Sequence, residues 1–544
     1  MKLIKYNKLR TYFFGALLSS LSLVSCTEEN IIELEPYNQL SENSAFDTKE
    51  NILLSVNGMY QAAQVGLYNN GGTSQSGRGY PFGAAYFQQN DMRGEDMVNT
   101  ASFYAITYTN NWDPSGALNT VYYWIDTYRL VNRANLVIEG VTKAIEKGVI
   151  SDAEGKDIIG QALFFRAFSH YELLNFFARP YKFTSGASHS GVPYRLKPSN
   201  SVATIEENSK LGRGTVAENY TQLLSDLDTA ENYLLSKTTK SAKNAIVYVS
   251  KEAAIALKTR VYLSKGDYPK VIAEADKLNG KYSLTSDPNA PFANNYGNTE
   301  SIFSLENSAT NNPSVNGALA SQYNGRALIA ISPVIWNQSM WLATDKRRGS
   351  NLVKTLLNAQ NQPICYLSNK YKDTSTLSDA SPLLRYAEVL LNRAEAKARL
   401  NDNTYLADLN AVRNRSLANP TTEQYSAFAT KADAVNAVLM ERRIEFLAEG
   451  LRWNTIHRLQ HDDIAPMNGV PQKYKNGANP VFADYKIGIP YVFKTGDVAS
   501  LAYTDYRFVW PLPTLETSAN PTLAAQQNPG SDKPSDPVSE GHRR

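Results

Sequence analysis

Apolar side chains recur every three or four positions along much of the chain, which is the spacing of one face of an α-helix. In the segment 152–177, for example, Ala162, Phe165, Phe168 and Leu173 would lie inward together. The sequence therefore predicts a mainly α fold with little β structure. The predicted helices span 47–65, 118–146, 152–177, 216–235, 250–264, 268–279, 382–400, 405–416 and 431–460.

Several of these helices form pairs that are joined by short polar turns. Gly266-Asp267 divides the pair at 250–279, and Asn401-Asp402-Asn403 divides the pair at 382–416. Small alanines on the facing sides would let the helices approach closely, and such pairs can stack into a superhelix. The pairs look like degenerate tetratricopeptide repeats, so we expect a tetratricopeptide-like helical-pair scaffold with long irregular loops.

The stretches between the pairs are long and rich in Gly, Asn, Ser and aromatic residues. Loops of this length are uncommon unless they are functional, and binding sites usually lie on loops that a rigid scaffold holds. We expect one domain over 46–530, with a loop-rich ligand-binding subdomain at about 281–380, and a disordered polar tail over 531–544. The long loops lie at about 66–117, 180–215, 281–380 and 462–530.

The N-terminus has the pattern of a secretory signal peptide. Its first ten residues carry four basic side chains and no acid, and an uncharged, largely apolar run from Tyr12 to Ser25 follows. That run is too short to cross a bilayer, which needs about 20 apolar residues. We therefore predict a cleaved signal peptide at 1–25.

The end of this run resembles a lipobox, since Leu23-Val24-Ser25 directly precedes Cys26. We predict that Cys26 is acylated and that 26–45 forms a lipidated tether to the membrane. The acidic Thr27-Glu28-Glu29 resembles the surface-export signal of Bacteroidetes lipoproteins. The alternatives are ordinary cleavage with a free Cys26 and an acidic tail that is merely solvated.

Charge and cysteine content bear on the partners of the protein and on what stabilises its fold. Without the signal peptide the chain has 51 basic and 52 acidic side chains, and no basic block remains. This balance argues against nucleic acid as a partner. The other cysteine, Cys365, has no partner once Cys26 is acylated, so the fold must depend on its core rather than on disulfides.

Four segments of the chain, when they are taken together, form a specific sequence pattern. They are the lipobox with its acidic continuation, Arg166 to Pro180, Glu441 to Arg458, and Trp510 to Gly530. In this order they resemble the SusD/RagB family of outer-membrane nutrient-binding lipoproteins. The resemblance implies a non-catalytic protein that captures oligosaccharide at the cell surface and sits over a TonB-dependent (SusC-like) barrel. Oligopeptide capture and a repeat scaffold for protein partners are the alternatives.

The third segment is unusually charged. Helical spacing places Arg442 beside Glu445, and Glu449 beside Arg452. These residues could form a charged ligand site, but we favour a structural ion network that fixes one helix against another.

Two loop regions, about 80–112 and 292–341, mix aromatic side chains with amides. Aromatic faces suit the C–H faces of sugars, and amides suit their hydroxyl groups. The family resemblance implies that such loops converge from an early and a middle part of the chain, although burial in the core is an alternative for each aromatic residue. The predicted ligand-binding residues are Tyr80, Phe82, Tyr86, Asn90, Trp112, Tyr296, Tyr323, Trp336 and Trp341.

Catalytic and metal-binding motifs are not evident. His457 and His461 share a helical face, but the glutamate of a metalloprotease helix and a third ligand are missing. Glu95-Asp96 is the best acidic cluster in a loop, yet adjacent acids rarely face each other across a substrate as a glycosidase requires. We expect these acids to cap turns, accept sugar hydroxyls or bind an ion, and we predict no enzyme activity, metal or cofactor.

Overall fold

The structure is a computed structural model, and it describes residues 44–66, 77–112 and 118–528. The predicted signal peptide, Cys26, nearly all of the tether and the C-terminal tail lie outside the described residues. From Phe46 onward the chain forms one unit.

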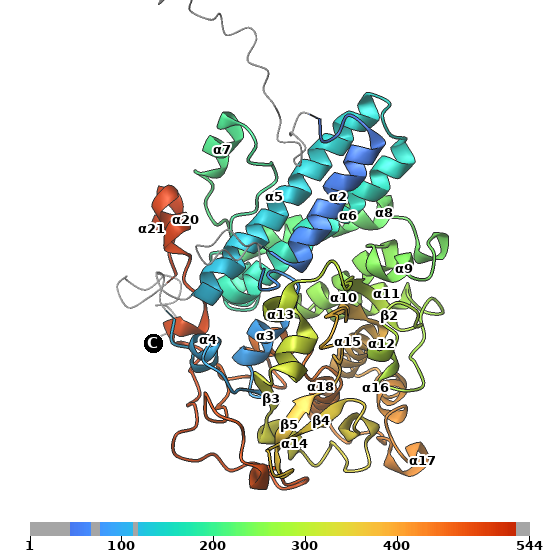
Figure 1. Ribbon diagram of the computed structural model, residues 1–544, viewed down its shortest axis with the longest axis vertical. Coiled ribbons are helices and arrows are strands. Elements are labelled where there is room, and N and C mark those ends of the chain that lie inside the picture. The colour runs from blue at the N-terminus through green and yellow to red at the C-terminus, as the bar shows by residue number, and fades with distance from the viewer. Residues whose placement is uncertain (1–43, 67–76, 113–117, 529–544) are drawn as a thin grey trace, which may run out of the picture. The chain divides into compact units, whose positions relative to one another are not determined.

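Helix α6 (Asp152–Phe177) is the centre of the helical part of the protein. The Ser151 side chain caps its first turn by accepting a hydrogen bond from the Glu154 amide. Helices α5 (Leu118–Glu146) and α8 (Val216–Tyr233) both pack against α6, and Figure 1 shows these long helices together in the upper part of the view. Because neighbours cover it, α6 is buried around most of its circumference and carries apolar side chains on several faces.

The helix pairs are present and stack on one another. Helix α10 (Lys251–Lys265) packs against α11 (Tyr268–Asp276), α11 packs against α15 (Tyr386–Arg399), and α15 packs against α16 (Tyr405–Asn414). The turn within the first pair uses Gly266 in the left-handed conformation, at φ 80°, to end α10. The prediction of a mainly α fold with helical pairs, long loops and little β structure is confirmed.

The helix predicted at 382–400 begins later than its apolar pattern indicates. Residues Ser381–Arg385 form strand β6, which pairs antiparallel with β2 (Ser301–Leu305), and α15 begins only at Tyr386. Pro382 lies in β6 and has no amide hydrogen to give to a helix. The prediction for these first residues is therefore wrong, because pairing with a strand far away in sequence overrides the helical spacing.

The single helix predicted at 431–460 is also wrong. The structure has two helices here, α18 (Lys431–Glu445) and α19 (Arg452–Arg458), with a break between them. Ala448 and Gly450 in the break have φ angles of 63° and 68°. A Cβ atom on Gly450 would lie 2.8 Å from the Phe87 Cα atom, so both the backbone angle and the close approach require glycine.

The strands of the described residues form three two-stranded antiparallel sheets. Besides β2–β6, strand β1 (Met97–Asn99) pairs with β3 (Ile329–Ile331), and β4 (Val353–Leu357) pairs with β5 (Pro363–Ser368). In the described part of the chain, no helix has the length and apolar character that crossing a bilayer requires. The remaining helices are α2 (Lys49–Gln64), which packs on α5, and the shorter α3 (Ala84–Arg93), α4 (Ala105–Thr109), α7 (Val202–Asn208), α9 (Asn244–Val247), α12 (Ala290–Ala293), α13 (Ser314–Gly317), α14 (Pro333–Trp336), α17 (Pro420–Glu423), α20 (Thr514–Ala519) and α21 (Pro521–Ala525).

Candidate functional site

The two loop regions predicted to bind ligand pack against each other, although they lie far apart in the sequence. Strand β1 pairs with β3, and the Thr100 amide continues this ladder by donating to the Leu328 carbonyl at 3.1 Å. The Tyr323 hydroxyl donates to Asp91 Oδ2 at 2.6 Å. We call this contact between residues 80–112 and 313–341 the loop junction.

Eight of the nine predicted ligand-binding residues lie inside the protein, and Tyr296 alone among the nine keeps partial exposure. Phe82, for example, is fully buried and stacks on Phe168 with ring centroids 4.4 Å apart. In this structure these side chains pack inside the protein, and none of them exposes more than 6% of its surface. The eight buried residues are Tyr80, Phe82, Tyr86, Asn90, Trp112, Tyr323, Trp336 and Trp341.

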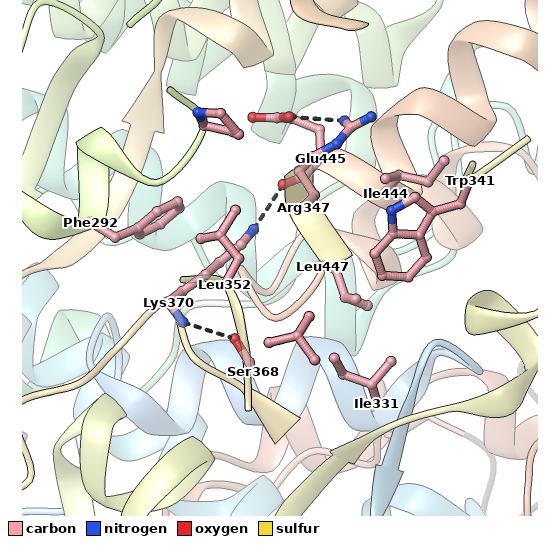
Figure 2. Close-up of a pocket in the computed structure, with 12 residues that line it drawn as sticks. Phe292, Ile331, Trp341, Arg347, Leu352, Ser368, Lys370, Ile444, Glu445 and Leu447 are labelled. Atoms are coloured by element: carbon pink, nitrogen blue, oxygen red, sulfur yellow. Dashed lines mark hydrogen bonds and ion pairs between the residues drawn. The ribbon is translucent and has the colours of Figure 1, made fainter. Parts of the chain in front are cut away.

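Trp336 and Trp341 illustrate this placement. The Arg348 guanidinium lies over both indole rings, 4.5 and 4.1 Å from their centroids. Trp341 also lines a cavity of about 20 Å³, together with Phe292 and Lys370 (Figure 2). A cavity of that size holds about one water molecule, so no sugar ring fits beside Trp341.

The charged segment of α18 forms a buried ion network, as we favoured from the sequence. Glu445 is almost fully buried and pairs with Arg347, Arg385 and Arg415. Burial alone would raise the pKa of Glu445, but the guanidinium groups of Arg415 and Arg385 lower it well below its usual value. Figure 2 shows the Glu445–Arg347 pair and the hydrogen bond from Lys370 to the Glu445 carbonyl. The network fixes α18 against neighbouring segments.

The two local ion pairs predicted within this segment do not form, and that prediction is wrong. Arg442 donates to the Asn392 side chain instead of pairing with Glu445. Glu449 pairs with Lys370 and Arg385 because the break after α18 turns it away from Arg452.

Glu95 and Asp96 also form buried ion pairs with arginines. Both acids pair with Arg443 and Arg452. Burial raises the pKa of Glu95, but the two guanidinium groups outweigh it and lower the pKa to about 2. Neither carboxylate is left free to accept a sugar hydroxyl, and among the described residues no group of three or more His, Cys, Asp or Glu side chains could hold a metal ion.

An open groove of about 360 Å³ lies beside the loop junction, and we call it the tyrosine groove. It is formed by α2, the end of α9 and the segment that follows β2. The Tyr60 and Tyr248 rings meet edge to face in it, with centroids 5.4 Å apart. Its other lining residues are mostly amides and short polar side chains. The full lining is Asn57, Tyr60, Gln61, Gln64, Val247, Tyr248, Leu305, Glu306, Ser308 and Asn311.

The two tyrosines of the groove differ in their hydroxyl groups. Tyr60 donates to Gln161 Oε1 at 2.6 Å and accepts from the Val249 amide at 3.0 Å, so its hydroxyl belongs to the core. The Tyr248 hydroxyl has no hydrogen-bond partner among the described residues, and its ring is half-buried. Asn57 and Gln61 are exposed on the same face of α2. These groups are available to a ligand.

Tyr296 does not line this groove, but it contacts the segment 305–311 that forms one side of it. Its hydroxyl donates to the Asn307 carbonyl at 3.1 Å, and the Lys243 ammonium, which pairs with Glu306, lies 5.5 Å from its ring centroid. Burial raises the pKa of Tyr296 to about 12, so the hydroxyl stays protonated at neutral pH. Of the nine predicted residues, Tyr296 is the one that the structure brings next to an open surface.

Comparison with known proteins places the chain in a family. Residues 344–530 match the model described as the SusD family, and residues 32–263 match a second model of SusD-like proteins, described as starch-binding and associating with the outer membrane. Together the two models match more than half of the chain. The chain belongs to the SusD family. It is similar to SusD-like protein P2 of Formosa agariphila, with 22% identity over 538 residues that cover 89% of this chain and 97% of that protein.

Solved SusD structures share the fold. A SusD superfamily protein from Bacteroides fragilis aligns with a TM-score of 0.68 and 25% identity, covering 88% of this chain and 99% of its own. The surface glycan-binding protein A from Bacteroides uniformis aligns with a TM-score of 0.64 and 18% identity, covering 88% and 99%. At the lower identity the likeness concerns the fold alone.

Sequence reasoning missed most of the tyrosine groove of this SusD-family protein. Asn57, Tyr60 and Gln61 belong to a predicted scaffold helix, and nothing in a helical pattern tells which exposed face lines a groove. The amide-rich run from Asn307 to Asn312 inside the predicted ligand-binding subdomain was the available signal. Aromatic content alone indicates the wrong residues here, because large rings in loops are often core residues.

Proposed function

We propose that this SusD-family protein is a non-catalytic cell-surface lipoprotein that captures an oligosaccharide and delivers it to a TonB-dependent, SusC-like outer-membrane barrel. The observation that carries the proposal is the tyrosine groove, which offers aromatic rings on an open surface, with the side-chain amides of Asn57, Gln61 and Asn311, which bond no described residue. The family description, starch-binding and associating with the outer membrane, supports the same class of ligand and location.

The chemistry of the groove suits a sugar. A pyranose ring has apolar C–H patches that the half-buried Tyr248 ring can cover, and hydroxyl groups that need both donors and acceptors. The side-chain amides of Asn57, Gln61 and Asn311 provide both kinds of group within one residue type. We propose Tyr248 and the amides as contacts, with Tyr296 beside the segment 305–311.

Membrane attachment and delivery rest on the sequence. Cys26 follows a lipobox-like run at the end of a signal peptide, and an acyl chain contributes about 0.8 kcal/mol for each methylene that enters the bilayer. An anchored capture protein at the outer face would hold its ligand beside the transporter.

Binding measurements on two variants test the groove. Titration calorimetry with a panel of neutral oligosaccharides first identifies a ligand for the wild type. The double variant that carries Tyr248→Ala and Gln61→Ala should then bind that sugar about tenfold more weakly or worse, because each substitution removes a ligand contact. Tyr233→Ala is the matched control, since Tyr233 is a half-buried tyrosine of α8 that does not line the groove.

The alternatives have distinct outcomes in the same experiment. Binding of oligopeptides in place of sugars would support oligopeptide capture. Failure of both ligand classes would favour a scaffold for protein partners. Sugar binding that is unchanged in the Tyr248→Ala and Gln61→Ala double variant would place the site elsewhere and contradict the assignment of the groove.

A further inference from the structure

A second open pocket lies where the loop after α6 meets the C-terminal end of α10. Its volume is about 430 Å³, and it is lined by the consecutive residues Tyr181 to Ala187 together with Lys265. We call it the lysine pocket. The tyrosine groove lies near the start of α10, because the Val249 amide bonds Tyr60 there. At 1.5 Å per residue the 15-residue helix separates the two by about 20 Å.

Two ammonium groups of the lysine pocket have little compensation from acids. Lys265 forms no ion pair among the described residues, and its ammonium lies 5.6 Å from the Tyr181 ring centroid. The carboxylate nearest to Lys182 belongs to Asp462, at 3.8 Å. Asp462 already accepts hydrogen bonds from the Arg399 guanidinium at 2.9 and 3.0 Å and from two backbone amides. Both lysines therefore keep donors for another anion.

The backbone of the pocket adds further donors. The amides of Thr184, Ser185 and Gly186 donate to no other described residue. Gly186 and Ala187 follow each other with φ angles of 64° and 51°. Successive amides in such a turn form a concave surface that favours anions. Thus the loop backbone and the two lysine side chains both offer hydrogen-bond donors to an anion.

We propose that the lysine pocket is a second binding site, which recognises an oxyanion carried by an acidic sugar, either a sulfate or a carboxylate. The hydroxyl oxygens of a neutral sugar can accept hydrogen bonds from these donors, but a neutral sugar brings no negative charge to the two ammonium groups. An oxyanion accepts charge-assisted hydrogen bonds from both, and the Tyr181 ring beside Lys265 offers an apolar face to the sugar that carries it. The choice of a sugar as carrier rests on the proposed function, whereas the affinity for the oxyanion does not.

Calorimetric titration with three trisaccharide-sized probes tests the site: trigalacturonate, a sulfated galactan oligosaccharide and neutral maltotriose, all at one fixed low ionic strength. The wild type should bind at least one acidic probe. The Lys182→Ala and Lys265→Ala double variant should bind it about tenfold more weakly or worse, because two charge-assisted contacts are lost. Comparison of the two acidic probes tells which oxyanion is preferred, and inorganic sulfate should compete with either.

Two controls separate the lysine pocket from the tyrosine groove and from a general effect of surface charge. Lys270→Ala removes an exposed charge from α11 outside the pocket, and it should leave binding of the acidic probe unchanged. Tyr248→Ala alters the tyrosine groove and should also leave it unchanged, so that failure of the groove and failure of the pocket are seen separately. The proposal is overturned if the wild type binds neither acidic probe, if Lys270→Ala weakens binding as much as the double variant, or if Tyr248→Ala abolishes it. Circular dichroism confirms that each variant is folded.

Discussion

The loop junction and the tyrosine groove contain the same kinds of side chain but use them differently. In the junction the Tyr323 hydroxyl is fully buried and donates to Asp91, and the Phe82 ring is covered by Phe168. In the groove the Tyr248 hydroxyl has no partner among the described residues, and the amide of Gln61 is exposed. Loop composition alone therefore does not separate a binding surface from a core, because the separation depends on whether a second segment covers the first.

The difference has a thermodynamic consequence. Removing a covered side chain leaves a cavity or an unpaired polar group, and it should lower the free energy of unfolding. Removing an open side chain changes stability little and should instead lower affinity for the ligand. Substitutions in the two regions can therefore be ordered by their expected effect on stability.

The largest effect is expected from Phe82→Ala in the loop junction. Phe82 is fully buried, so its truncation should lower the free energy of unfolding by about 3–5 kcal/mol. Denaturant unfolding of the purified domain measures this change. The control is Phe493→Ala, a half-buried phenylalanine in a surface loop, for which we expect a loss of about 1 kcal/mol or less. Equal losses in the two variants would contradict the contrast between a covered and an open region.

A smaller, pH-dependent effect is expected at Glu172, which contacts the junction through Tyr86. The Tyr86 hydroxyl and the Asn454 amide donate to Glu172 Oε1 at 3.4 and 3.3 Å, and Oε2 has no partner among the described residues. Burial raises the pKa of Glu172 from 4.5 to about 7. The folded state thus binds more protons than the unfolded state between these pH values, and stability falls as pH rises from about 4.5 to 7.

The variant Glu172→Gln removes this titration. It should be more stable than the wild type by about 1–3 kcal/mol at pH 8, and the advantage should disappear near pH 4, where the wild-type carboxyl is protonated in both states. Unfolding curves at the two pH values give the difference directly. An advantage that is the same at both values would show that packing, rather than the buried charge, is responsible.

Local structure was predictable to the extent that local forces decide it. The bounds of α6 follow from its sequence, because Ser151 caps its start and Pro180 follows its end. The end of α18 did not follow, because the break is required by the contact of Gly450 with Phe87, about 360 positions earlier. The sequence indicated that the charged residues of α18 form a structural ion network. It did not indicate which arginines pair with the α18 glutamates, because Arg347 and Arg385 come from distant segments.

The candidate site was predictable only in part, for the same reason. The early and middle loop regions do converge, and the predicted subdomain at about 281–380 contains Glu306, Ser308 and Asn311 of the groove. Which aromatic ring faces outward depends on contacts between loops that lie hundreds of residues apart. Tyr248 was missed because it follows the four-residue helix α9, which carries no distinct pattern.

The smallest and sharpest contrast lies within the tyrosine groove, between Tyr60→Phe and Tyr248→Phe. Tyr60→Phe removes a hydroxyl that bonds Gln161 and the Val249 amide, so we expect a loss of about 1–3 kcal/mol in the free energy of unfolding. Tyr248→Phe removes a hydroxyl that bonds no described residue, and stability should stay within about 0.5 kcal/mol. Because the two substitutions delete the same atom within one groove, each is the control for the other. If Tyr248→Phe destabilises the protein as much as Tyr60→Phe does, its hydroxyl is engaged by the protein and is not open to a sugar.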